Sequence, residues 1–235
     1  MTVYDVIESL SGKLIVSCQA LANEPLYGAI YMAAMARAAE LGGAAGIRAN
    51  AADNIAAIHA AVSLPILGIN KRRVPGYEVF ITPDFADARL VVEAGAQLVA
   101  LDGSAGARPG GAALPDIIGR IHDELHVPVM ADCSCLEDGL YAEAAGADII
   151  ATTLAGYSKH GRPTMPGPDL DLISDLVKQV KQPIIAEGRF HEPREVAQAF
   201  ERGVFAVVIG TAITRPSEIT RRFVAALPKS TEKGG

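Results

Sequence analysis

Eight short, almost continuously apolar runs divide this chain of 235 residues, and segments with helical periodicity lie between them. Such runs are typical of parallel strands that are buried on both faces. Several helical segments end in a glycine, which readily takes the left-handed conformation of a helix C-terminus; these are Gly95, Gly146 and Gly203. The runs are Leu14–Ser17, Ala44–Ile47, Pro65–Ile69, Leu98–Leu101, Pro128–Ala131, Ile149–Thr152, Pro183–Ala186 and Ala206–Ile209.

The repeated order of strand and helix predicts the fold class. Eight units of this kind indicate an α/β protein with a (β/α)8 TIM barrel, which about 200–250 residues form as a single domain. We expect one catalytic barrel domain over residues 1–228 and a disordered C-terminal tail over residues 229–235. An open doubly wound sheet is the alternative. It favours a glycine-rich turn after the first strand, and residues 17–21 contain no glycine.

Charge, apolar runs and cysteines narrow the class of function. A net charge of −6 argues against a nucleic-acid partner, which needs a basic face, but one or two arginines can still hold a small anion. No apolar run approaches the ~18 residues of a membrane span, so we expect no membrane partner. Three cysteines indicate no disulfide framework and favour the cytoplasm. Cys133 and Cys135 have no second ligand pair at suitable spacing, which disfavours a metal site.

Polar or charged residues follow nearly every apolar run. In a (β/α)8 barrel the C-terminal ends of the strands converge on the active site, so these side chains should lie together. A structural rim would need some polar residues, but not this many charged ones. We therefore predict a catalytic cluster from Gln19, Arg48, Asn50, Asn70, Lys71, Arg72, Asp102, Asp132, Thr152, Thr153, Glu187, Gly188, Arg189, Gly210 and Thr211.

Lys71 is the predicted general base. It follows a buried strand, and a lysine acts as a base only if its pKa falls from ~10.4 toward neutrality. Partial burial and the neighbouring charge of Arg72 should lower the pKa of Lys71. Two alternatives are a structural ion pair between Lys71 and Asp102 and a Schiff base between Lys71 and a carbonyl substrate.

Glu187 is the predicted partner of Lys71, because it ends the seventh apolar run. A carboxyl group there could protonate or polarise a substrate oxygen while Lys71 removes a proton. Asp132 has two interpretations. It either orients Lys71 or binds a substrate hydroxyl, or it serves as the ion-pair partner of Arg48.

The seventh and eighth turns are predicted to bind a phosphate. Gly188 and Gly210 follow these strands, where many barrels hold phosphate against backbone N–H groups and a helix N-terminus. Arg215 can pair with the same phosphate, and Pro216 suits the first position of the last helix. The alternative is a pair of ordinary glycine-containing loops.

Ten segments together resemble the N-acetylmannosamine-6-phosphate 2-epimerase family. The resemblance extends in order over about residues 13 to 224. The segments are Ile15–Leu21, Glu24–Leu26, Gly42–Asn50, Gly68–Arg72, Tyr77–Pro83, Ala100–Asp102, Ala131–Asp132, Thr152–Tyr157, Ala186–Arg189 and Ala212–Pro216.

The resemblance implies an epimerase of amino sugar phosphates in bacterial sialic acid breakdown, with a (β/α)8 fold and no metal or organic cofactor. It implies that Lys71 is the base at C2 of the sugar and that Glu187 is its partner. A homodimer is expected if apolar helix faces stay exposed after packing. The expected substrate-binding residues are Gln19, Arg48, Asp132, Asp102 and Thr153, and the expected phosphate-binding residues are Gly188, Arg189, Gly210, Thr211 and Arg215.

The chain departs from the family pattern at a few positions. Thr211 replaces a glycine, and because a β-branched residue resists positive φ we expect a differently shaped phosphate turn. None of the departures removes a predicted catalytic group. Two other functions remain open: a barrel lyase that uses Lys71 as a Schiff base, and a non-catalytic sensor of phosphosugars.

Overall fold

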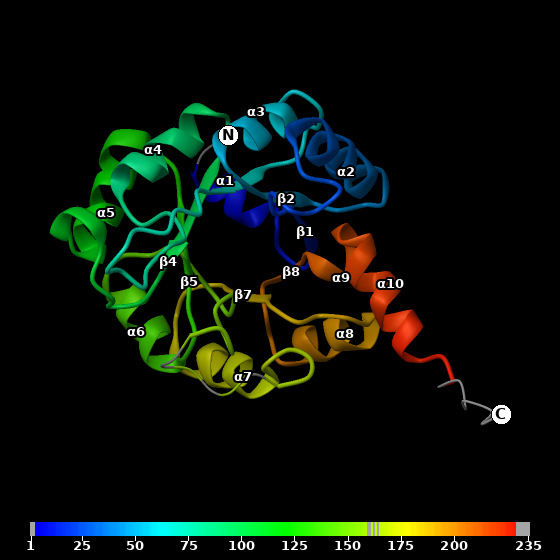
Figure 1. Ribbon diagram of the computed structural model, residues 1–235. Coiled ribbons are helices and arrows are strands. Elements are labelled where there is room, and N and C mark those ends of the chain that lie inside the picture. The colour runs from blue at the N-terminus through cyan, green and yellow to red at the C-terminus, as the bar shows by residue number, and fades with distance from the viewer. Residues whose placement is uncertain (1–2, 159–160, 162, 164, 229–235) are drawn as a thin grey trace.

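The chain folds into a closed barrel of eight parallel strands, shown in Figure 1. The structure is a computed structural model that describes residues 3–158, 161, 163 and 165–228, so the predicted tail lies outside the described residues. The barrel confirms the predicted (β/α)8 fold. Its strands are β1 (Leu14–Cys18), β2 (Gly46–Asn50), β3 (Ile66–Ile69), β4 (Leu98–Asp102), β5 (Val129–Asp132), β6 (Ile149–Ala151), β7 (Ile184–Glu187) and β8 (Ala206–Ile209).

Helices surround the barrel in Figure 1. The glycines expected at helix ends, Gly95, Gly146 and Gly203, all have the positive φ that this position favours. Within the described residues, no helix has the length and apolar content to cross a membrane. The helices are α1 (Val3–Glu8), α2 (Ala29–Leu41), α3 (Ala52–His59), α4 (Phe85–Glu93), α5 (Leu114–Arg120), α6 (Leu136–Ala144), α7 (Leu170–Gln179), α8 (Pro193–Glu201), α9 (Thr211–Thr214) and α10 (Pro216–Ala225).

Two apolar clusters fill the molecule. The larger one packs the outer face of the barrel against the helices, and the smaller one fills the barrel interior with residues such as Leu67, Leu98 and Met130. Close packing at Gly68 leaves no room for a side chain, because a Cβ there would lie 2.6 Å from the Ala96 Cβ. The barrel is therefore a solid support for the polar groups at its C-terminal end.

The second strand differs from its prediction. The apolar run ends at Ile47, but β2 continues through Arg48 to Asn50. Arg48 is buried, with only 1 % of its surface exposed, and apolar patterning alone treats an arginine as a strand end. Ion pairs inside the barrel compensate its charge, which is why the strand can continue through this residue.

Candidate active site

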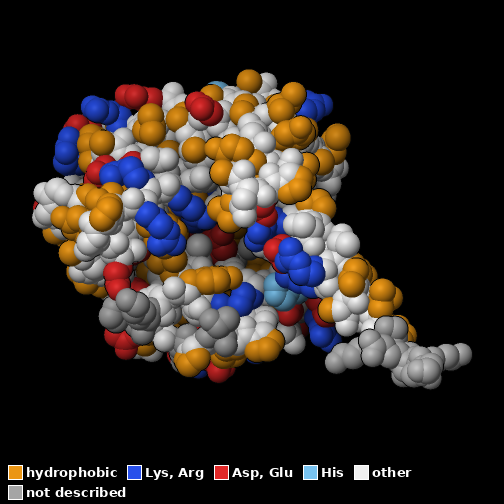
Figure 2. Space-filling model, in the orientation of Figure 1, with side chains coloured by type: hydrophobic (Ala, Val, Ile, Leu, Met, Phe, Trp, Pro, Cys, Tyr) orange, Lys and Arg blue, Asp and Glu red, His pale blue; other side chains and the backbone are white. Residues whose placement is uncertain are grey.

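Arg48 and Asp132 form the buried centre of the site. The Arg48 Nη1 lies 3.0 Å from one Asp132 oxygen, and its Nη2 lies 2.5 Å from the other. Burial lowers the pKa of Arg48, but the charges of Asp132 and Glu187 outweigh this and raise it, so the guanidinium stays charged. Of the two interpretations of Asp132, the structure shows the ion pair with Arg48. Figure 2 shows acidic side chains in a central hollow, with Lys and Arg side chains around it.

Glu187 and Thr153 extend this centre. The Glu187 Oε2 lies 3.1 Å from the Arg48 Nη1. The Thr153 hydroxyl lies 2.7 Å from an Asp132 oxygen and 3.0 Å from the Glu187 Oε2, and its single proton can be donated to one carboxylate at a time. Burial raises the pKa of Glu187, and Asp132 adds to this rise, while Arg48 opposes it. The site therefore holds a carboxyl group that accepts a proton more readily than an ordinary glutamate.

Lys71 lies at the open mouth of the barrel, above this centre. Its Nζ donates to the Gln19 Oε1 at 2.6 Å, and the Gln19 amide in turn donates to the Ser17 hydroxyl at 2.7 Å. Surrounding protein atoms that displace water lower the pKa of Lys71, and the charge of Arg48 lowers it further. The carboxylate of Glu187 acts in the opposite direction. The structure thus brings together a lysine with a lowered pKa and a glutamate with a raised pKa.

The predicted influence of Arg72 on Lys71 is wrong. Successive residues of an extended chain point to opposite sides, so Arg72 turns away from the site. Its Nη2 lies 2.6 Å from Asp84 and 2.7 Å from Asp87 instead. The positive charges that lower the pKa of Lys71 belong to Arg48 and, more weakly, to Arg73.

Asp102 forms no ion pair with Lys71 within the described residues. One of its carboxylate oxygens accepts hydrogen bonds from the Ser104 backbone N–H at 2.9 Å and the Ser104 hydroxyl at 2.6 Å. This removes the structural alternative for Lys71 that the sequence left open. Arg108, which the sequence analysis missed, is buried and donates to the backbone carbonyl of Asp102. It lies in a glycine-rich loop that gave no sign of a buried charge.

The turn after β7 contains two successive residues with positive φ, Gly188 at 111° and Arg189 at 57°. The Arg189 guanidinium donates to the backbone carbonyls of Gly167, at 2.8 Å, and Ala155. This side chain therefore joins the loops that follow β6 and β7. A phosphate contact from Arg189 would come from its backbone N–H.

The turn after β8 leads directly into α9. Gly210 precedes the helix and Thr211 is its first residue. Thr211 does not have a positive φ, so its β-branched side chain causes no backbone strain there. The Thr214 hydroxyl donates to the Ser17 carbonyl at 2.9 Å and ties this turn to β1. The eighth turn thus lies beside the first, where Gln19 is located.

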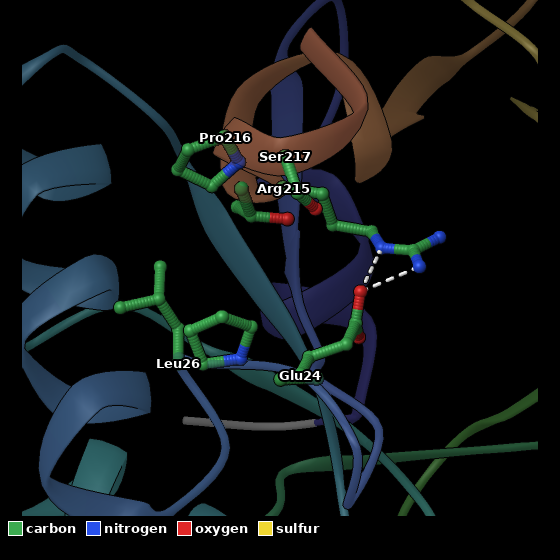
Figure 3. A pocket seen from close by; sticks show the side chains of 8 residues that line it. Glu24, Leu26, Arg215, Pro216 and Ser217 are labelled. Carbon is green, nitrogen blue, oxygen red and sulfur yellow. Dashed lines mark hydrogen bonds and ion pairs between the residues drawn. The ribbon is translucent and has the colours of Figure 1, made fainter. Parts of the chain in front are cut away.

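Arg215 has an ion-pair partner that sequence reasoning missed. The Glu24 Oε1 lies 2.7 Å from the Arg215 Nε and 2.5 Å from its Nη2. Both residues line a pocket together with Leu26, Pro216 and Ser217, as Figure 3 shows. Glu24 is separated from Arg215 by 191 positions, so local patterns could not reveal the pair. Pro216 begins α10, as predicted.

Comparisons with known proteins identify the family of this chain. A family model described as "Putative N-acetylmannosamine-6-phosphate epimerase" matches residues 32–229. This chain belongs to that epimerase family. A relative from Caldanaerobacter subterraneus subsp. tengcongensis, named "Putative N-acetylmannosamine-6-phosphate 2-epimerase", is 49 % identical over 94 % of this chain and 93 % of its own length. A relative of the same name from Listeria monocytogenes serovar 1/2a is 41 % identical over 98 % of both chains.

A solved structure of the N-acetylmannosamine-6-phosphate 2-epimerase from Clostridium perfringens resembles the present barrel with a TM-score of 0.91. It is 40 % identical in sequence, and the match covers 94 % of this chain and 96 % of that one. The thiamine phosphate pyrophosphorylase from Pyrococcus furiosus, 16 % identical with a TM-score of 0.58, shares the fold only. The family resemblance found in the sequence is therefore confirmed.

Within this epimerase family member, the described residues contain no group of three or more His, Cys, Asp or Glu side chains placed to hold a metal ion. The polar groups of the site are instead paired with one another. Arg48 is an exception in one respect, because its buried Nε has no hydrogen-bond partner among the described residues.

Proposed function

We propose that this protein interconverts N-acetylmannosamine 6-phosphate and N-acetylglucosamine 6-phosphate by moving a proton at C2, as an isomerase in amino sugar and sialic acid breakdown. We infer the substrate from the names of the related proteins. The observation that carries the mechanism is the placement of the Lys71 amine above the buried Arg48–Asp132 pair and the half-buried Glu187. Among the predicted site residues, Lys71 is the basic side chain whose pKa is lowered.

The chemistry requires an open-chain substrate. The hydrogen at C2 is acidic only when C1 is an aldehyde, since the carbanion is then stabilised as an enediolate. The neutral Lys71 amine takes this proton and becomes an ammonium, and negative charge moves to O1. Glu187 in its protonated form donates a hydrogen bond or a proton to O1, which offsets this charge. The intermediate then turns, and the Lys71 ammonium, which exchanges its protons with solvent, returns a proton to the other face of C2. Lys71 is thereby neutral again, C1 is again an aldehyde, and the inversion is complete.

Arg48 and Thr153 hold the carboxylates in place. The two-pronged contact of Arg48 with Asp132 leaves its Nη1 within 3.1 Å of Glu187, so one guanidinium orients both acids. The Thr153 hydroxyl bridges the same two groups. We assign Gln19 to the orientation of the Lys71 amine, and Asp102 and Thr153 to the substrate-facing rim.

Epimerisation itself can be tested from both directions. Each of the two phosphosugars, incubated separately with the protein, should reach the same mixture, which proton NMR of the anomeric signals would quantify. Conversion of neither sugar would refute the proposed reaction.

The phosphate is assigned to the backbone N–H groups of Gly188, Arg189, Gly210 and Thr211 and to the side chain of Arg215. Arg215→Ala is expected to raise KM about tenfold with little change in kcat, because a phosphate contact is made equally in the ground and transition states. The expected rise in KM is only moderate, because Arg215 must break its ion pair with Glu24 before it can bind the phosphate. Steady-state kinetics would measure it, with Arg221→Ala, an exposed arginine on α10, as control. An unchanged KM would exclude Arg215 from the phosphate site.

The pH dependence of kcat/KM should report Lys71. Activity is expected to rise with pH as Lys71 loses its proton, because only the neutral amine accepts one, and to fall at higher pH as Glu187 loses the proton that it offers to O1. Burial lowers the pKa of Lys71 and raises the pKa of Glu187, which favours the reacting state. Glu187→Gln cannot ionise, so this variant should have a lower kcat and no fall at high pH. A pH profile of each protein would measure both changes, with Glu93→Gln as control. An unchanged fall at high pH in Glu187→Gln would exclude Glu187 as its cause.

We also propose where and in what form the enzyme works. Its three cysteines are free, which suits the cytoplasm.

Helix α10 buries none of its residues against the barrel, and Phe223 is 74 % exposed on it. In Figure 1 this helix extends away from the barrel, so a second copy of the chain is the proposed cover for its apolar face. We treat residues 1–228 as one catalytic unit.

A further inference from the structure

Strands β3 and β4 separate toward their C-terminal ends. They pair directly only where Leu67 lies opposite Leu98 and Gly68 lies opposite Val99. Beyond that point a returning segment, residues 80–82, lies between them. We call residues 80–82 the wedge. The wedge forms hydrogen bonds with both strands. On the β3 side the Thr82 N–H donates to the carbonyl of Asn70, the residue after β3, at 2.9 Å.

The contact with β4 uses the wedge's backbone and one side chain. The Asp102 N–H donates to the Ile81 carbonyl at 3.0 Å. The Thr82 hydroxyl donates to the Ala100 carbonyl at 2.6 Å and accepts the Asn70 N–H at 3.1 Å. One hydroxyl therefore links both strands across the gap that the wedge opens.

Thr82 has an unfavourable backbone conformation at this position. Its φ is 45°, in the left-handed region that β-branched residues rarely adopt, and its side chain is fully buried. Such a conformation is unfavourable and persists only where surrounding contacts enforce it. Residues of this kind often lie near functional sites.

The wedge is paired with Lys71 itself. Ile81 lies directly opposite Lys71 in an antiparallel bridge, and the Arg72 N–H donates to the Phe80 carbonyl at 2.9 Å. Residues directly opposite in such a bridge point to the same side. Ile81 is buried in the cluster that fills the barrel interior, so Lys71 is directed into the mouth of the barrel. On its other side, the Lys71 N–H donates to the Asn50 Oδ1 at 2.8 Å.

We propose that Thr82 is a positioning residue that locks the wedge between β3 and β4 and thereby sets where the Lys71 amine enters the site. Thr82 does not contact the reacting atoms in this account. Its role in turnover rests on the proposed epimerase function, but its role in placing Lys71 does not. The two can therefore be measured separately.

Three variants test the proposal. Thr82→Val keeps the shape and removes the hydroxyl. Thr82→Gly also removes the hydroxyl but adopts positive φ without strain, so it remains informative if the valine variant fails to fold. Thr82→Ser keeps the hydroxyl and should restore wild-type behaviour. Ser9→Ala is the control, because it removes a hydroxyl that donates to the Val6 carbonyl at the opposite end of the barrel.

Two readouts are needed. The rate at which acetic anhydride labels Lys71, followed by mass spectrometry across a pH series, gives the apparent pKa of this amine without any need for turnover. Epimerase assays give kcat and KM. Thr82→Val and Thr82→Gly should raise the apparent pKa of Lys71 toward that of a free lysine and lower kcat about 10²-fold with little change in KM, the loss typical of a reacting group displaced by about 1 Å. Thr82→Ser and Ser9→Ala should match the wild type.

The outcomes separate the two claims. Identical labelling of Lys71 in Thr82→Gly and in the wild type would overturn the positioning role, whether or not the protein is an epimerase. Altered labelling supports the positioning role even if the wild type converts neither phosphosugar, and in that case only the proposed function fails.

Discussion

Lys71→Met is expected to lower kcat by about 10²–10⁴-fold, the range that a positioned general base contributes. Methionine has a similar length but no basic nitrogen, so the C2 proton has no acceptor in the site. Substrate binding should be nearly intact, because the proposed phosphate contacts come from the loops after β7 and β8. The measurement is the initial rate of epimer formation together with the affinity for N-acetylmannosamine 6-phosphate.

A matched control distinguishes the loss of the base from the loss of a positive surface charge. Lys178→Met removes an exposed lysine on α7 and should leave both values unchanged. Normal turnover in Lys71→Met would remove Lys71 from the mechanism. Borohydride trapping of the wild type with substrate distinguishes the lyase alternative, because only a Schiff base at Lys71 would give a stable covalent adduct.

Arg48→Met should have the largest effect on stability. The variant leaves the buried carboxylate of Asp132 and the half-buried carboxylate of Glu187 without the Arg48 cation, and loss of one partner of a buried ion pair such as Arg48–Asp132 costs about 3–5 kcal/mol of the free energy of unfolding. For a chain of this size, this corresponds to a fall in Tm of roughly 6–20 °C. Activity should fall as well, because Asp132 and Glu187 lose the group that orients them.

The pH dependence of this loss tests its cause. Protonation removes the unpaired charges, so the difference in Tm between the variant and the wild type should shrink as the pH is lowered from alkaline to mildly acidic values. Calorimetry at several pH values would measure it. Arg37→Met is the control, because Arg37 is exposed and donates to the backbone carbonyl of Ala61. A deficit that stays constant with pH would show that packing, and not charge, holds Arg48 in place.

Much of the fold and part of the site could be predicted from the sequence. The apolar runs marked the strands because parallel barrel strands are buried on both faces, and the residues after them marked Lys71, Asp132 and Glu187 because all strand ends meet on one face. The directions in which side chains point were harder to predict from the sequence. Arg72 was expected beside the Lys71 amine, although alternation along an extended chain places it on the other side.

Contacts between distant segments could not be predicted. The pairing of Arg215 with Glu24, the bonds of Arg189 to the Ala155 and Gly167 carbonyls, and the insertion of the wedge between β3 and β4 all depend on how loops pack in three dimensions. A sequence pattern reveals periodicity and local turn residues. It does not reveal these contacts, because the residues that they join have no fixed spacing along the chain. The conformation of Thr82 is the clearest case, because β-branched residues are the ones least expected at positive φ.

Proton transfer at C2 of a phosphorylated N-acetylhexosamine can be followed by proton NMR of the protein with N-acetylmannosamine 6-phosphate in D2O. We expect N-acetylglucosamine 6-phosphate that carries deuterium at C2, since the Lys71 ammonium lies at the open mouth of the barrel and exchanges with solvent. A bound phosphosugar that forms no epimer and keeps its C2 hydrogen would show that the protein does not move this proton.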